Sequence, residues 1–136
     1  MIVDTNVLLR AAVIDDALQT EQARQCLRDA AQIFVSTVAL CEFVWVARRF
    51  YRMSSAEVAH AIRLLVADRK VVFDRAAVEA GLSLLEAGGD FADGVIAFEG
   101  RRLGGEIFAT FDRKAAVVLE KAGQECLSLS DQPIGH

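Results

Sequence analysis

Short apolar segments alternate with helix-like segments along the whole of this 136-residue chain, and that alternation restricts its fold more than any other feature. Five such segments read as strands apolar on both faces, at residues 1–4, 32–36, 71–73, 106–110 and 125–129. Strands of this kind occur mainly in parallel sheets covered by helices on both sides. The pattern therefore predicts an α/β protein, a three-layer α/β/α sandwich with a mainly parallel five-stranded sheet.

The segments between the strands carry helix start and stop signals. Residues 54–57 (SSAE) predict a capping box for a helix that ends near residue 68. A helix from Ser36 or Thr37 is expected to run to about Arg52. Gly88 and Gly89 stop the next helix, and Asp90 caps the one after it. No linker or repeat interrupts this series, so residues 1–136 are expected to form a single domain.

Composition excludes several classes of protein. Hydrophobic residues make up 54% and charged residues 25%, which rules out disorder. No apolar run reaches the ~18 residues of a membrane span, and the N-terminus lacks the basic region of a signal peptide. Cys26, Cys41 and Cys126 are read as reduced thiols. A cytoplasmic location with no membrane partner is expected. The net charge of −4 argues against coating nucleic acid by bulk charge.

Four acidic residues stand out by position. Asp4 follows the first predicted strand and Asp112 the fourth, so both are expected at one edge of a parallel sheet. Glu42 and Asp93 each stand alone in an apolar helical run, where an unpaired buried carboxylate would be costly. We predict that the four side chains converge.

Convergence would need a counter-charge. Six pairwise repulsions at ~6 Å sum to roughly 4–17 kcal/mol, comparable with the stability of a domain. A divalent cation relieves this repulsion, and ligands that are all oxygen indicate Mg²⁺ or Mn²⁺. A purely structural interpretation stays open, because Asp4, Asp90 and Asp112 could be helix N-caps and Asp93 could interact with a helix dipole.

Four short motifs resemble those of the PIN-domain family, specifically the small VapC-like toxins of type II toxin–antitoxin systems. They are residues 2–6 (IVDTN), 37–42 (TVALCE), 90–97 (DFADGVIA) and 110–114 (TFDRK), in the order and spacing of the family. Gly94 departs from the pattern, since the family more often carries alanine there. Glycine costs about 1 kcal/mol of helix propensity at such a position.

The resemblance implies a metal-dependent endoribonuclease that hydrolyses RNA phosphodiester bonds. Asp4, Glu42, Asp93 and Asp112 would be the catalytic and metal-binding residues. Asn6, Asp90, Thr110 and Arg113 are auxiliary candidates, with Lys114 as a further backbone contact. The family's sheet order of 3-2-1-4-5 would place the first and fourth strands side by side.

The resemblance also implies partners: an RNA substrate (tRNA or another structured RNA), a cognate antitoxin and a second copy of the chain. Apolar residues such as Trp45 and Phe50 would suit an interface if they are not in the core. Arg10, Arg48, Arg49, Arg101 and Arg102 are candidates for a basic rim.

Two rival functions remain at the level of sequence. One is a Mg²⁺-dependent phosphatase or phosphotransfer domain with Asp4 as nucleophile, although a D-x-D signature is absent. The other is a non-catalytic binding module with the same fold. His60 and His136 have no partner at ligand spacing, so neither is assigned a catalytic role.

Overall fold

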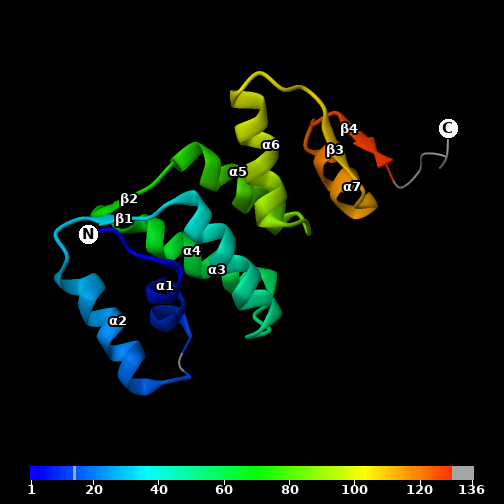
Figure 1. The fold of residues 1–136 in the computed structure, drawn as a ribbon. Coiled ribbons are helices and arrows are strands. Elements are labelled where there is room, and N and C mark those ends of the chain that lie inside the picture. Colours follow the sequence, from blue (N-terminus) through cyan, green and yellow to red (C-terminus); the bar gives the residue numbers. More distant parts are fainter. Residues whose placement is uncertain (14, 130–136) are drawn as a thin grey trace. The chain divides into compact units, whose positions relative to one another are not determined.

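The computed structural model describes residues 1–13 and 15–129. The chain forms two compact units, Met1–Arg75 and Ala76–His136, called here the first and second units. Figure 1 shows helices α1–α4 with strands β1 and β2 in the first unit, followed by α5–α7 with β3 and β4. Each unit thus combines several helices with one pair of strands.

Four helices of the first unit begin at side-chain caps. They are α1 (Thr5–Ala12), α2 (Ala17–Asp29), α3 (Thr37–Arg49) and α4 (Ser55–Ala67). Ser36 Oγ accepts a hydrogen bond from Ala39 N at the start of α3. The capping box predicted before α4 is confirmed, because Ser54 and Glu57 exchange hydrogen bonds with each other's backbone N–H.

The strands of the first unit are parallel and very short. Strand β1 (Ile33–Phe34) pairs with β2 (Val71–Val72), and Ile2 forms a parallel bridge to Phe34. The first predicted strand therefore neighbours the second, which neighbours the third. Val3, Ile33 and Val35 are buried against the helices.

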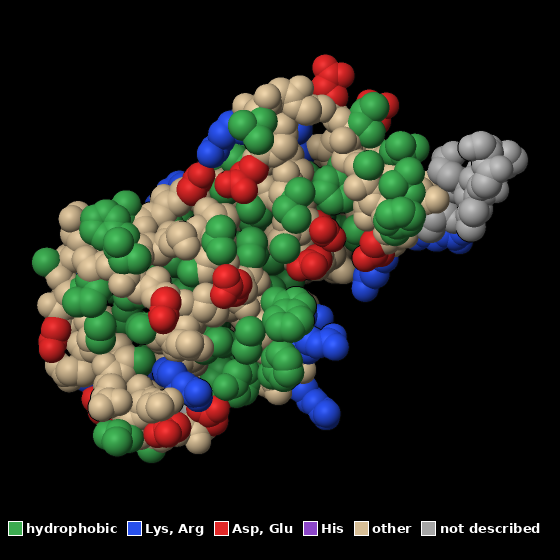
Figure 2. Space-filling view, viewed as in Figure 1, with side chains coloured by type: hydrophobic (Ala, Val, Ile, Leu, Met, Phe, Trp, Pro, Cys, Tyr) green, Lys and Arg blue, Asp and Glu red, His purple; other side chains and the backbone are tan. Residues whose placement is uncertain are grey.

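The core of the first unit does not take in every apolar residue. Leu40, Val58 and Ile62 are fully buried, whereas Val38, Trp45 and Phe50 are exposed. Figure 2 shows hydrophobic side chains spread over the visible surface of this unit among the charged ones. The apolar run of α3 is therefore buried on one face and open to solvent on the other.

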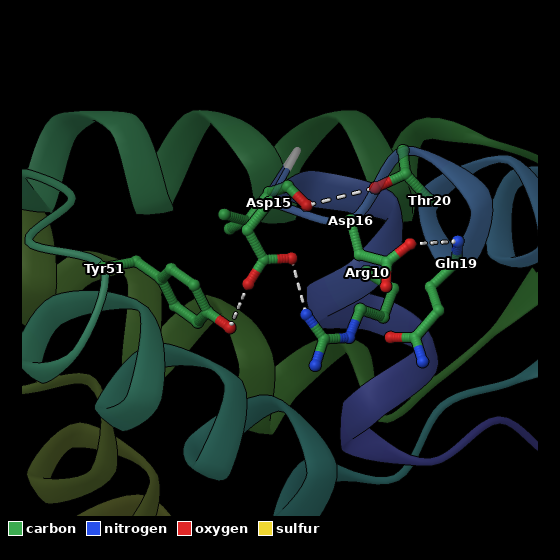
Figure 3. Close-up of polar contacts among 7 residues, drawn as sticks. Arg10, Asp15, Asp16, Gln19, Thr20 and Tyr51 are labelled. Atoms are coloured by element: carbon green, nitrogen blue, oxygen red, sulfur yellow. Dashed lines mark hydrogen bonds and ion pairs between the residues drawn. The ribbon is translucent and has the colours of Figure 1, made fainter.

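A polar network ties the connection between α1 and α2 to the end of α3 (Figure 3). Arg10 Nη1 lies 2.5 Å from Asp15 Oδ1, and Tyr51 OH donates to Asp15 Oδ2 at 3.0 Å. These two donors stabilise the ionised carboxylate, so the pKa of Asp15 is lowered, with Arg10 as the larger cause. Gln19 N donates to Asp16 Oδ1 and completes the cap of α2.

The second unit contains α5 (Arg75–Glu86), α6 (Phe91–Arg102), α7 (Arg113–Lys121), β3 (Phe108–Thr110) and β4 (Cys126–Ser128). Strands β3 and β4 pair in parallel. Gly88, with φ of +96°, follows α5 in the left-handed conformation that glycine tolerates best.

Two glycines let α5 and α6 approach closely. A Cβ at Gly81 would lie 2.6 Å from the ring of Phe91, which is fully buried. A Cβ at Gly94 would lie 2.5 Å from the backbone oxygen of Ala80. Gly94 therefore allows the two helices to cross, which explains why this position holds glycine and not alanine.

The five predicted strand positions are all extended and paired, but the five-stranded sheet and the three-layer sandwich are not confirmed. Within residues 1–13 and 15–129 the pairing gives two separate two-stranded parallel sheets and one bridge. The strands are short because the caps Asp4, Ser36 and Asp112 begin helices within two residues of a paired position. The organisation as one domain stays a prediction.

Helix α3 ends at Arg49, earlier than the predicted Arg52. Arg52 has φ of +52°, the only positive φ of a non-glycine residue among those described. A right-handed helix cannot continue through that conformation. None of the helices in the described ranges is long and apolar enough to cross a membrane.

Candidate metal centre

Asp4 and Glu42 are linked through Thr5 in the first unit. Asp4 caps α1, its Oδ1 accepting a hydrogen bond of 3.0 Å from Val7 N. Thr5, the first residue of α1, donates from Oγ1 to Glu42 Oε2 at 3.1 Å. The start of α1 and the middle of α3 are thereby tied together, and both carboxylates are exposed.

Asp112 occupies a similar position in the second unit. Its Oδ1 caps α7 by accepting hydrogen bonds from Lys114 N at 2.9 Å and Ala115 N at 3.2 Å. Thr110 Oγ1 accepts from Asp112 N at 3.0 Å and fixes the turn between strand and helix. Thr110, an auxiliary candidate in the sequence, therefore has a structural role in this turn.

Asp93 lies in the first turn of α6, and Asp90 is the N-cap of that helix. Asp90 Oδ1 accepts from Ala92 N at 3.2 Å. Partial burial raises the pKa of Asp93, and the charges of Asp90 and Asp112 raise it further. The third and fourth acidic motifs therefore place their carboxylates within electrostatic range of each other.

The sequence interpretation needs one correction. Glu42 was expected to be buried, but its side chain is exposed because one face of α3 is open to solvent. The capping roles foreseen for Asp4, Asp90 and Asp112 are confirmed. Capping uses Oδ1 of each carboxylate, and each has a second oxygen, so a cap can also be a metal ligand.

The structure relates the acids in two sets, Asp4 with Glu42 and Asp93 with Asp112. Convergence of all four remains a prediction. Among the described residues, no group of three or more His, Cys, Asp or Glu side chains is arranged to hold a metal ion. The donors themselves fit a hard divalent cation, because they are carboxylate oxygens. Burial, and after it the charges of Asp90 and Asp112, raise the pKa of Asp93, and a cation would relieve the repulsion among these acids.

The remaining candidates have varied surroundings. Asn6 is exposed and lines a polar hollow of about 480 Å³ together with Asp4, Arg10 and Gln19. Of the predicted rim, Arg10 binds Asp15, Arg101 donates to Gln124, and Arg102 lies 4.6 Å from the ring of Phe98. Arg113 is exposed at the start of α7. His60 is exposed on α4, and His136 lies outside the described residues.

Sequence reasoning missed two positioning groups. Thr5 orients Glu42, and its one available signal was its place directly after Asp4. Gln124 is buried and donates to the backbone oxygens of Glu106 and Glu125. These two residues precede β3 and β4, so Gln124 links the segments that lead into the two strands. Nothing in the local sequence marks Gln124 as different from a surface glutamine.

Comparison with models of known protein families identifies the family of this chain. A family model for the PIN domain matches residues 1–121, a range that includes all four acids. The chain belongs to the PIN-domain family. PIN domains have an α/β fold, are typically metal-dependent nucleases and generally bind divalent metal ions. A search of curated proteins found no match.

Proposed function

We propose that this PIN domain is a metal-dependent endoribonuclease that hydrolyses RNA phosphodiester bonds and acts as the toxin of a toxin–antitoxin pair. The observation that carries the proposal is the PIN-domain match, which spans Asp4, Glu42, Asp93 and Asp112. The negative charges of Asp90 and Asp112 near the partly buried Asp93 support it, since a cation would relieve their repulsion.

Asp4, Glu42, Asp93 and Asp112 would hold Mg²⁺ or Mn²⁺. The cation, when bound, supplies Lewis-acid chemistry that activates water and stabilises the leaving oxygen. The protein contributes the orientation of the ligands. The caps at Asp4 and Asp112 fix one carboxylate oxygen each, and Thr5 fixes Glu42. Hydrolysis of this kind needs no 2′-hydroxyl nucleophile and leaves a 5′-phosphate and a 3′-hydroxyl.

The direct test is cleavage of end-labelled RNA by purified protein with Mg²⁺, with Mn²⁺ and with EDTA. Asp4→Asn, Asp93→Asn and Asp112→Asn should each abolish cleavage while circular dichroism stays unchanged. Asparagine can still cap the helices at positions 4 and 112, and Asp93 is not a cap. Cleavage that survives Asp4→Asn and Asp93→Asn would point to a contaminating nuclease and contradict the assignment.

Two further assays, for a phosphorylated aspartate and for RNA binding, separate the rival functions. A phosphoaspartate trapped at Asp4 would favour the phosphotransfer reaction. Metal-dependent RNA binding without turnover would favour the binding module. The chemistry of the ends, read by ligation of the 5′-phosphorylated product, distinguishes metal-assisted hydrolysis from cleavage through the 2′-hydroxyl.

The toxin role predicts a cognate antitoxin and a second copy of the chain as partners. An apolar hollow of about 570 Å³ in the first unit supports a protein partner, since Leu8, Phe43 and Leu65 line it with Glu57 at its rim. Co-expression with the antitoxin should relieve growth arrest caused by the chain. Growth arrest that persists in the Asp4→Asn variant would contradict a catalytic toxin.

A further inference from the structure

The end of α3 combines aromatic and cationic side chains. Residues 48–52 read RRFYR, with three arginines in five positions of a chain whose net charge is −4. Arg48, Arg49, Phe50 and Arg52 are exposed, and Trp45 precedes them by one helical turn. Figure 2 shows hydrophobic and basic side chains side by side over this end of α3.

The aromatic rings of this surface are open to solvent and packed against each other. Trp45 is 57% exposed and Phe50 is 64% exposed. Their ring centroids lie 5.5 Å apart at an interplanar angle of 70°, a contact in which the edge of one ring meets the face of the other. The guanidinium of Arg49 lies 5.7 Å from the centroid of the Trp45 ring.

The surface is continuous with the candidate site. Glu42, Trp45 and Arg49 follow at spacings of three and four residues, so they share one face of α3. Arg52 adds a cation at the corner after the helix, at φ of +52° where glycine would be unstrained. An RNA strand lying along this face would reach Glu42 within two turns of the helix.

Exposed aromatic side chains among arginines are the chemistry that binds single-stranded nucleic acid, with bases stacking on rings and phosphates contacting cations. We propose that the surface formed by Trp45, Arg48, Arg49, Phe50 and Arg52 binds an unpaired segment of RNA and leads it to Glu42. This inference rests on the proposed nuclease function. It names the surface of this chain that receives the RNA.

Charge favours RNA over a second copy of the chain as the occupant. A two-fold contact places the same patch on both subunits, so three arginines would face three arginines. Like charges across an interface oppose association, whereas a phosphate backbone neutralises them.

Trp45 is the only tryptophan in the chain, so intrinsic fluorescence reports on this surface alone. The experiment titrates the full chain, in EDTA to prevent cleavage, with a single-stranded oligoadenylate of about 12 nucleotides and with a duplex of the same length. The single strand should quench Trp45 saturably, and the duplex should bind at least tenfold more weakly. Phe50→Ala should weaken binding by about 5- to 150-fold.

Arginine variants separate a specific contact from bulk charge. Arg49→Gln should weaken binding and reduce the slope of log affinity against log salt by about 0.7. Arg69→Gln is the matched control, because Arg69 is an exposed cation of the same unit that follows the end of α4 and is not part of the proposed surface. Equal effects of the two variants would overturn the proposal.

Two further outcomes would also overturn it. One is the absence of quenching, or equal quenching by duplex RNA. The other is a Trp45 emission that changes with protein dilution, with a dimer in sedimentation that Trp45→Ala disrupts, which would make this face a homodimer contact. EDTA keeps the two proposals distinguishable: quenching without metal-dependent cleavage contradicts only the nuclease function, and cleavage without quenching contradicts only the RNA surface.

Discussion

The hydroxyl of Thr5 donates a 3.1 Å hydrogen bond to the carboxylate of Glu42, 37 residues away along the chain. Thr5 follows the cap Asp4, so a single side chain connects the first two acidic motifs. Hydrogen bonds to charged groups contribute about 1.5–3 kcal/mol. The orientation of Glu42 should therefore depend on Thr5.

Replacing Thr5 tests this role. Thr5→Val keeps the shape of the side chain but removes the donor, so cleavage should fall about tenfold and require more Mg²⁺. Thr5→Ser should restore both, because serine retains the hydroxyl. The measurement is the initial rate of cleavage across a Mg²⁺ titration. Full activity of Thr5→Val at low Mg²⁺ would show that Glu42 needs no such support.

Gly94 should be irreplaceable in α6 despite its poor helix propensity. Gly94→Ala gains up to about 1 kcal/mol of propensity but loses about 1–3 kcal/mol through the clash with Ala80 O. Its melting temperature should fall by a few degrees. Gly100→Ala is the control in the same helix, because a Cβ there meets nothing within 4 Å. Gly100→Ala should be neutral or stabilising, and the opposite order of the two variants would refute the close crossing.

The raised pKa of Asp93 predicts that the metal-free protein loses stability as the pH rises. Above the ordinary aspartate pKa of 3.8, the unfolded chain ionises more readily than the folded one, so stability falls as pH rises through the folded pKa. Metal-free Asp93→Asn should therefore melt higher than the wild type at pH 7, with no difference at pH values below 3.8. Thermal melts across this range provide the measurement.

Divalent cations should reverse that difference. Mg²⁺ should raise the melting temperature of the wild type more than that of Asp93→Asn, because the variant lacks one ligand charge. Glu99→Gln is the control, an exposed acid on the same helix. Equal stabilisation of all three proteins by Mg²⁺ would place the cation elsewhere.

Asp15 should show the opposite dependence on pH. Its pKa is lowered by Arg10 and then by Tyr51, so it adds stability above 3.8 that is lost as pH falls through its folded pKa. Asp15→Asn should lower the melting temperature at pH 7, and the difference should shrink in acid. Tyr51→Phe should have a smaller effect in the same direction. A pH-independent difference would mean that packing, and not charge, stabilises this corner.

The positions of strands and helix caps could be predicted from the sequence because they depend on neighbouring residues. Ser54 and Glu57 form their capping box within four residues, and Gly88 ends a helix through its own backbone. The exposure of Glu42 could not be predicted in this way. It depends on which face of α3 the rest of the first unit covers, and the apolar residues Val38 and Trp45 lie on the uncovered face.

Gly94 is a second feature whose role could not be predicted from neighbouring residues. Local propensity marks it as a small defect in α6, whereas the approach of Ala80 from α5 makes it necessary. The candidate acids were found because each interrupts an apolar run or follows a strand. The hydrogen bond between Thr5 and Glu42 was not found, since these two residues meet only through long-range folding.

The caps at Asp4 and Asp112 have an evolutionary consequence. Asparagine satisfies the same backbone N–H groups as aspartate, so one substitution at either position removes a negative charge without unravelling the helix behind it. Under the nuclease function that we propose, a single substitution at either cap would therefore give an inert chain that still folds. Such a copy would keep the helices of an active one and differ from it only in chemistry.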